Sequence, residues 1–195
     1  MDVLTQQLMK QLAGAGLSKI SQKVGADEQT TSTVMSTVMP LLVTALARNA
    51  AKPDGAQSLH KALVEDHDGG ILNNLSGYLN APETANGDGI LKHVLGGQQP
   101  VVTQALARQT GLENNQVGQI LQIAAPLLMG ALGQQQKQQG LDISSLAAFL
   151  GNQQKTDQQE NPGLMSTLNS LLDFDGDGSA VDDVIGMFGQ LFGKK

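Results

Sequence analysis

EDHDGGILNNLSGYLNAPETANGDGILKHVLGG, residues 65–97, is the most distinctive stretch of the chain, and it joins two halves with similar sequences. Within it, an aspartate followed by glycine precedes an Ile-Leu pair twice, at residues 68–72 and 88–91. Aspartate at a helix start accepts hydrogen bonds from free backbone amides, and glycine allows a sharp turn into the helix. The stretch therefore predicts two short helices that begin at Asp-Gly, with a polar loop between them.

The sequences on either side of this stretch align with each other. When Pro126 is placed on Pro40, an offset of 86 residues, residues 111–132 follow the glycine and apolar pattern of residues 25–46. Such a match indicates a duplicated unit of several helices. The alternative is that any two helices rich in Leu and Ala align with each other.

Apolar residues recur at helical spacing in both halves, and glycines end the periodic runs. Asp27 is a predicted N-cap, and Pro40 lies inside a periodic run, where it either kinks or divides the helix. We predict an all-α fold. Its predicted parts are a helical domain over 1–150 with pseudo-repeats of about 1–64 and 97–150 joined by 65–96, a polar linker over 151–162, and a helix–acidic loop–helix tail over 163–195.

The amino-acid composition favours a helical fold and excludes several classes of function. Hydrophobic residues make up 40% of the 195 residues but aromatic residues only 3%, so the core must consist of aliphatic side chains. The absence of cysteine excludes disulfides, zinc–thiolate sites and thiol catalysis. A net charge of −6 argues against general binding to nucleic acid. We recognise neither a signal peptide nor a run long enough to span a bilayer, so a cytoplasmic location is expected.

Each half contains a pattern typical of a helix-turn-helix corner. In the second half, Ala107, Gly111, Val117 and Ile120 stand where this motif places a small residue, a turn glycine and two core residues. The segment that would be the recognition helix, residues 113–122, contains no Lys or Arg to contact phosphates. DNA binding is therefore the weakest alternative, and a corner used only for packing is preferred.

Four side chains of the central stretch could form a metal or acid–base site. Asp66, His67 and Asp68 are consecutive, and His93 follows in the second Ile-Leu phrase. Imidazole and carboxylate groups suit divalent metals and proton transfer. The spacing, however, matches no tight ligand motif, and the structural alternative is preferred: the aspartates cap helices and the histidines form hydrogen bonds across the loop.

Several phrases taken in order resemble a known family. They are ALARNA, GAQSLHKAL, EDHDGGILNNLSGYL, GDGILKHVLGG, VVTQALARQTGL and APLLMGALG. They resemble the bacterial domain-of-unknown-function family 937 (DUF937) over about residues 5–150 and, more distantly, YidB-like proteins. The resemblance implies a compact all-helical domain with homeodomain-like packing. It implies no activity, so no catalytic residue is carried over.

The end of the chain carries the sharpest chemical pattern. The string DFDGDGSAVDD, residues 173–183, lies between two apolar stripes and resembles the calcium loop of an EF-hand, with Val184 where the final Glu would stand. The alternative is an acidic turn without a specific ion. The candidate calcium ligands are Asp173, Asp175, Asp177, Ser179, Asp182 and Asp183.

The apolar stripe that follows, residues 181–192, is predicted to bind a protein partner or another copy of the chain. We find no phosphate-binding loop, cofactor fingerprint or nucleophile elbow. The sequence therefore predicts a non-enzymatic helical binding or scaffold protein with a calcium loop. The alternative is a metal-dependent enzyme that uses Asp66, His67, Asp68 and His93.

Overall fold

The computed structural model describes residues 3–160, 162–163 and 166, and within these residues it contains helices and no strand. The all-α prediction is thereby confirmed. The elements are α1 (Val3–Leu12), α2 (Ala15–Val24), α3 (Glu28–Ala50), α4 (Pro53–Glu65), α5 (Gly70–Asn73), α6 (Leu75–Asn80), the 3₁₀ helix η1 (Pro82–Ala85), α7 (Gly87–Leu95), the 3₁₀ helix η2 (Gly96–Gln98), α8 (Gln99–Thr110), α9 (Asn114–Gln139) and α10 (Ile143–Glu160).

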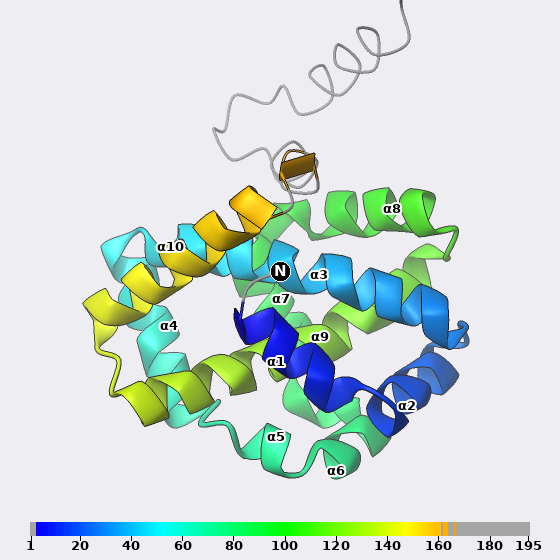
Figure 1. Ribbon diagram of the computed structural model, residues 1–195, viewed down its shortest axis with the longest axis horizontal. Coiled ribbons are helices and arrows are strands. Elements are labelled where there is room, and N and C mark those ends of the chain that lie inside the picture. The colour runs from blue at the N-terminus through cyan, green and yellow to red at the C-terminus, as the bar shows by residue number, and fades with distance from the viewer. Residues whose placement is uncertain (1–2, 161, 164–165, 167–195) are drawn as a thin grey trace, which may run out of the picture.

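The two long helices α3 and α9 contact each other at the centre of the molecule (Figure 1). Fourteen residues of each helix are buried, so both are enclosed on most sides. Pro40 lies inside α3 and Pro126 inside α9, and each helix continues through its proline. Division of the helix at Pro40, one of the two expectations, is therefore wrong. The missing amide leaves one helical hydrogen bond unmade but does not end the helix.

The same two helices correct the expectation that no segment is long enough to span a bilayer. By length and hydropathy alone, Glu28–Ala50 and Asn114–Gln139 both qualify. About three quarters of each apolar window is nevertheless buried inside the protein, at 72% and 78%. Core helices of a soluble domain have this property, so these two helices are weak evidence for a membrane.

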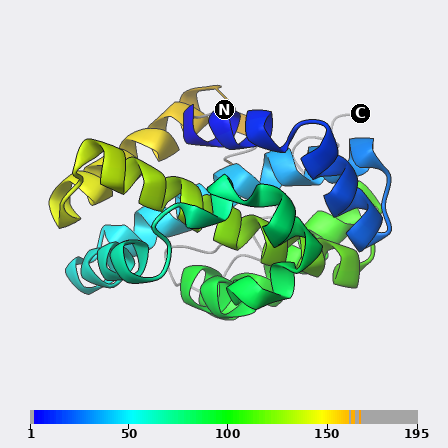
Figure 2. The same ribbon diagram turned by 90° about the horizontal axis from the view of Figure 1, so that it is seen from below.

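The shorter helices surround this pair. α10 packs against α3 and α4, α7 packs against α9 and α3, and α2 packs against α3 and α6. In Figure 1, α8 and α10 lie along the upper edge, with α5 and α6 along the lower edge. Figure 2 shows α1 on one face and the green α7–α8 region on the opposite face, with α3 and α9 between them. The buried side chains of these helices form one continuous core.

The helix ends follow the sequence signals. Gly25 ends α2 and Gly111 ends α8, both in the left-handed region with φ of 72° and 75°. Glycine enters this region without the steric cost that a Cβ imposes. The Asp27 carboxylate accepts a hydrogen bond of 2.8 Å from the backbone N–H of Thr30. The predicted terminations and the predicted N-cap are confirmed.

The polar segment after residue 150 is not a linker over residues 151–160, because α10 runs from Ile143 to Glu160 without interruption. Leu150 and Asp157 are buried on this helix, which packs against α3. Glutamine and lysine favour helix nearly as strongly as leucine does. A polar composition therefore indicates a linker only where no neighbouring helix offers a surface to pack against.

Candidate functional site

The central stretch forms a connection, residues 66–98, that is docked on the side of α9. Gly133 of α9 lies so close to the backbone carbonyl oxygen of His67 that a Cβ at this position would overlap it. Gly130, one turn earlier, similarly leaves room for the side chain of Ile71. These two glycines give α9 a flat surface, and the start of the connection lies directly on its backbone.

A second contact uses the backbone hydrogen bond that α9 lacks at Pro126. Because proline has no N–H, the carbonyl of Gln122, four residues earlier, lacks its helical partner. Gly87, at the start of α7, lies against this carbonyl oxygen, again without room for a Cβ. The hydroxyl of Tyr78 donates a 2.8 Å hydrogen bond to the next carbonyl, that of Ile123. The connection therefore occupies the backbone surface that the proline exposes.

Between these contacts the connection folds around an open cleft of about 770 Å³, which we call the central cleft. One wall comes from the turn between α4 and α5, and the other from α6, η1 and the start of α7. Its lining residues are Asp66, His67, Asp68, Gly69, Gly70, Ile71, Asn74, Gly77, Tyr78, Thr84, Ala85, Asn86 and Ile90.

The first wall is acidic. Asp66 and Asp68 are exposed, and His67 between them is half-buried. Asp68 accepts a 2.9 Å hydrogen bond from the N–H of Gly70 and lies 3.9 Å from the Lys137 Nζ. Burial lowers the pKa of His67, and the negative charge of Asp66 opposes this shift only in part. This wall therefore carries two aspartate side chains and an imidazole whose neutral form is favoured by burial.

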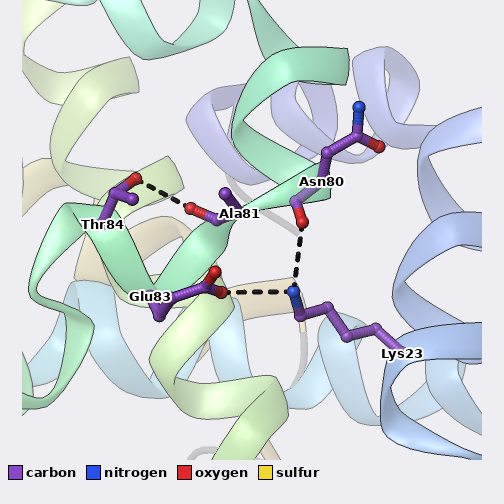
Figure 3. Close-up of polar contacts among 5 residues, drawn as sticks. All are labelled: Lys23, Asn80, Ala81, Glu83 and Thr84. Carbon is purple, nitrogen blue, oxygen red and sulfur yellow. Dashed lines mark hydrogen bonds and ion pairs between the residues drawn. The ribbon is translucent and has the colours of Figure 1, made fainter.

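The second wall carries amide and hydroxyl groups. Asn74 caps α6 by accepting a hydrogen bond from Gly77, and Asn86 caps α7 by accepting one from Gly89. Asn86 has φ of 50°, and it is the non-glycine residue in the left-handed region among those that the structure describes. Asparagine tolerates this conformation better than other side chains do. The Thr84 hydroxyl donates to the carbonyl of Ala81, which fixes the η1 turn (Figure 3).

A smaller cleft of about 420 Å³, the side cleft, lies on the other side of η1. Lys23 of α2 lines this cleft, and Lys19, one turn earlier on α2, binds the neighbouring helix α6. Lys19 Nζ donates to the Ser76 hydroxyl at 2.7 Å and to the Asn80 amide oxygen at 3.0 Å. Lys23 Nζ lies 3.2 Å from Glu83 Oε2 and 3.3 Å from the carbonyl of Asn80 (Figure 3). The connection is thus bound to the N-terminal helices as well as to α9.

The structure does not assemble the four-residue set of Asp66, His67, Asp68 and His93. His93 lies on α7, outside the lining of the central cleft, and its Nδ1 donates to the carbonyl of Gly89 at 2.8 Å. Among the described residues, no three His, Asp or Glu side chains are placed to hold one metal ion. The metal-site hypothesis for the central stretch is therefore corrected: His93 bonds within its own helix.

The predicted caps of the central stretch also need correction. Asp88 does not cap α7. Asn86 does so, and Asp88 instead pairs with Lys92 at 2.8 Å within the helix. Asp68 precedes Gly69, the N-cap residue of α5. Its carboxylate accepts a hydrogen bond from the backbone N–H of Gly70. Aspartate and asparagine are both favoured as N-cap residues. When both occur near a helix start, the backbone geometry decides which of them caps the helix.

Three contributors to the clefts were not predicted as site residues: Tyr78, Asn86 and Lys23. Tyr78 is the only tyrosine of the chain. A single tyrosine in a sequence with so few aromatic residues could have indicated a specific hydrogen bond by its hydroxyl. Nothing in the local sequence marks Lys23 or Asn86, because their partners lie far away in the chain or depend on backbone conformation. The predicted calcium ligands, Asp173, Asp175, Asp177, Ser179, Asp182 and Asp183, lie outside the described residues.

Taken together, the fold and its clefts define a small all-helical domain in which a long connection is docked against one central helix. Residues 6–135 match the model of a family described as bacterial protein of unknown function (DUF937), and the chain belongs to this family. The match covers α9 nearly to its end and the whole connection, so both clefts lie within the family region. No curated protein and no solved structure shows significant similarity to the chain.

Proposed function

We propose that the protein is a non-enzymatic binding protein and that its central cleft holds a cationic group of a partner, such as a lysine or arginine side chain. The observation that carries this proposal is the charge of the lining. Asp66 and Asp68 lie on one wall of a cleft of about 770 Å³, and the lining itself contains no Lys or Arg. Lys137, outside the lining, lies 3.9 Å from Asp68 and is exposed, so a ligand cation would compete with it for this carboxylate. A cation in the cleft would reduce the repulsion between the two carboxylates.

The uncharged surfaces of the cleft support the same kind of ligand. Ile71 and Ile90 offer contacts to the aliphatic part of a long basic side chain, and the amide of Asn74 faces the same space. Basic side chains bury their methylene groups on apolar surface while the charged end stays near acceptors. The neutral His67 beside Asp66 adds a polar group without adding a competing positive charge.

The test is calorimetric titration of the full chain with a short lysine- and arginine-containing peptide. We expect binding that weakens as salt rises, because exposed charges are screened. The double variant Asp66→Asn/Asp68→Asn should lose up to about tenfold in affinity, because each exposed ion pair contributes at most about 1 kcal/mol. The matched control is Glu65→Gln, since this exposed carboxylate lies beside the cleft but outside its lining. Equal loss in the control, or unchanged binding in the double variant, would contradict the proposal.

A second proposal concerns residues 173–183, and it rests on their sequence alone. Asp173, Asp175 and Asp177 alternate on a glycine-containing loop, which offers the hard oxygen ligands that calcium prefers. Titration of the full chain with calcium should give heat that Asp173→Asn/Asp175→Asn abolishes. The control, Asp54→Asn/Glu65→Gln, removes the same charge elsewhere and should leave the heat unchanged. Absence of heat at millimolar calcium would end this proposal.

A further part of the proposed description concerns an internal duplication of the helices. We interpret α2–α3–α4 and α8–α9–α10 as duplicated units with helix-turn-helix-like corners. In support, left-handed Gly25 and Gly111 end the first helix of each unit, and a proline lies inside the second. DNA binding is not favoured, because the Gln116 side chain of α9 donates to the carbonyls of Val24 and Gly25 instead of facing solvent. A cytoplasmic location remains the expectation.

A further inference from the structure

An apolar groove lies far from both clefts, where α10 begins beside the end of α3 and the start of α4. Its volume is about 600 Å³. The side chains that form it are small, and Ile143, which is 40% exposed, marks its edge. The apolar lining residues are Ala50, Ala51, Pro53, Ala56, Ile143 and Ala147, and the polar ones are His60, Asp142 and Ser144. We call this surface the α10 groove.

We propose that the apolar segment 181–192 of the same chain docks in the α10 groove and covers it. This docking is independent of any ligand in the central cleft, so failure of either proposal leaves the other intact. The segment carries apolar residues at the spacing of one helix face. Of the apolar residues that line the groove, Ala51, Pro53 and Ile143 are exposed, and Ala50 and Ala56 form its buried floor.

Size complementarity supports this occupant. Four of the nine residues that line the groove are alanines, so it accepts large apolar side chains and supplies few of its own. The segment supplies Phe188, Leu191 and Phe192, while only one phenylalanine, Phe149, occurs before residue 174. Large side chains inserted between small ones give the close packing that protein interiors require.

Charge complementarity agrees with the same placement. Asp142 is the acidic residue of the lining, and its carboxylate caps α10 by accepting from the Ser145 N–H at 2.8 Å. This hydrogen bond, followed by that of Ser144, lowers the pKa of Asp142 to about 2, so the carboxylate stays charged at neutral pH. Lys194 and Lys195 follow the segment after Gly193 and would bring positive charge to this rim, while Asp182 and Asp183 stand at the other end of the segment.

The chain is long enough for docking within one molecule. The groove lies at the beginning of α10, and a helix of 18 residues spans about 27 Å. Between residues 166 and 181 the chain has 15 steps, which reach about 50 Å when extended. The segment can therefore return along α10 to the groove without a second copy.

Disulfide trapping tests the docking, because the chain has no native cysteine. The full chain would carry Leu191→Cys together with Ala147→Cys in the groove. The control pair combines Leu191→Cys with Gln29→Cys, an exposed position near the other end of α3. At low micromolar protein, we expect trapping within monomers to be about tenfold faster for the groove pair, since docking raises the effective concentration.

A second pair of variants tests whether the groove itself causes this preference. Ile143→Asp places a charge at the edge of the groove, and Val64→Asp places one at an exposed valine of α4 outside it. Both positions are exposed, so the fold should tolerate both changes. We expect Ile143→Asp to remove the trapping preference and Val64→Asp to retain it. Equal rates for the two cysteine pairs, trapping only between two chains, or insensitivity to Ile143→Asp would each overturn the proposal.

Discussion

The two central helices α3 and α9 differ in what lies against them. Both are long, and each contains a proline. The offset of 86 residues that aligns Pro40 with Pro126 also aligns Thr44 with Gly130 and Ala47 with Gly133. In α9 these glycines lie beneath the connection, whose backbone contacts the helix directly. In α3 the corresponding residues, Thr44 and Ala47, have side chains, and both are buried. The difference teaches that glycine inside a helix can mark a docking surface, although it weakens the helix itself.

The largest expected effect comes from Gly133→Ala. The new methyl group would overlap the His67 carbonyl oxygen, so the connection or the helix must shift. We expect the free energy of unfolding in urea to fall by about 3 kcal/mol, at the upper end of overpacking costs. Gly118→Ala in the same helix is the control, because nothing lies within 4 Å of its added methyl. The control should gain up to about 1 kcal/mol from helix propensity. Similar values for both variants would remove the distinction between the two helices.

The reciprocal change, Ala47→Gly, makes α3 resemble α9 at the aligned position. Ala47 is buried, with 6% of its surface exposed. We expect a loss of about 1.5–2 kcal/mol, the sum of lower helix propensity and one lost buried methyl group. The same urea titration measures it. A neutral result would mean that α3 also has a surface that tolerates close backbone approach.

Tyr78→Phe tests the hydrogen bond that the connection makes to the backbone of α9 beside Pro126. The variant keeps the buried ring but leaves the Ile123 carbonyl without the hydroxyl that lies 2.8 Å away. Loss of one hydrogen bond of this kind costs about 1 kcal/mol. Burial raises the pKa of the Tyr78 phenol, so the native hydroxyl remains a donor through the usual pH range. Hydrogen exchange of residues near 78 should rise, and unchanged stability would show that the hydroxyl does not hold the connection.

The smallest effect is the pH dependence from His67. Its pKa is lowered in the folded protein, so below its ordinary value of about 6.5 the unfolded chain binds a proton that the folded chain does not. The contribution of His67 to stability is therefore complete above pH 6.5 and is lost as pH falls toward the lowered value. Between pH 7 and 5, the native chain should lose more stability than His67→Gln, by less than about 1 kcal/mol for a half-exposed group. Parallel profiles would contradict this assignment.

Local patterns in the sequence predict most of the helices, because helix ends depend on nearby residues. Gly25 and Gly111 stop helices as expected, and Asp27 caps one. The course of the connection is not predictable in this way. Gly87 and Gly133 look like ordinary flexible residues until the backbone they contact is known, and that backbone lies dozens of residues away.

The candidate site shows the same division between local and distant information. The Asp66–Asp68 cluster is visible in the sequence, and it does line the central cleft. The alternative that adds His93 to this cluster does not hold, because His93 bonds within α7 and lies outside the cleft lining. The role of Lys23 cannot be predicted from local sequence, because its partner Glu83 is 60 positions away.

The contact of Gly133 with His67 also bears on the order of folding. It closes a loop of 66 residues, from 67 to 133, and that closure must wait until α9 presents its flat surface. Loop closure of this length opposes docking with an entropy that grows with the logarithm of the loop. We therefore expect the connection to become ordered after α3 and α9 have paired, and to open before them. Native-state hydrogen exchange should then show the connection, residues 66–98, opening as one unit at lower free energy than the two central helices.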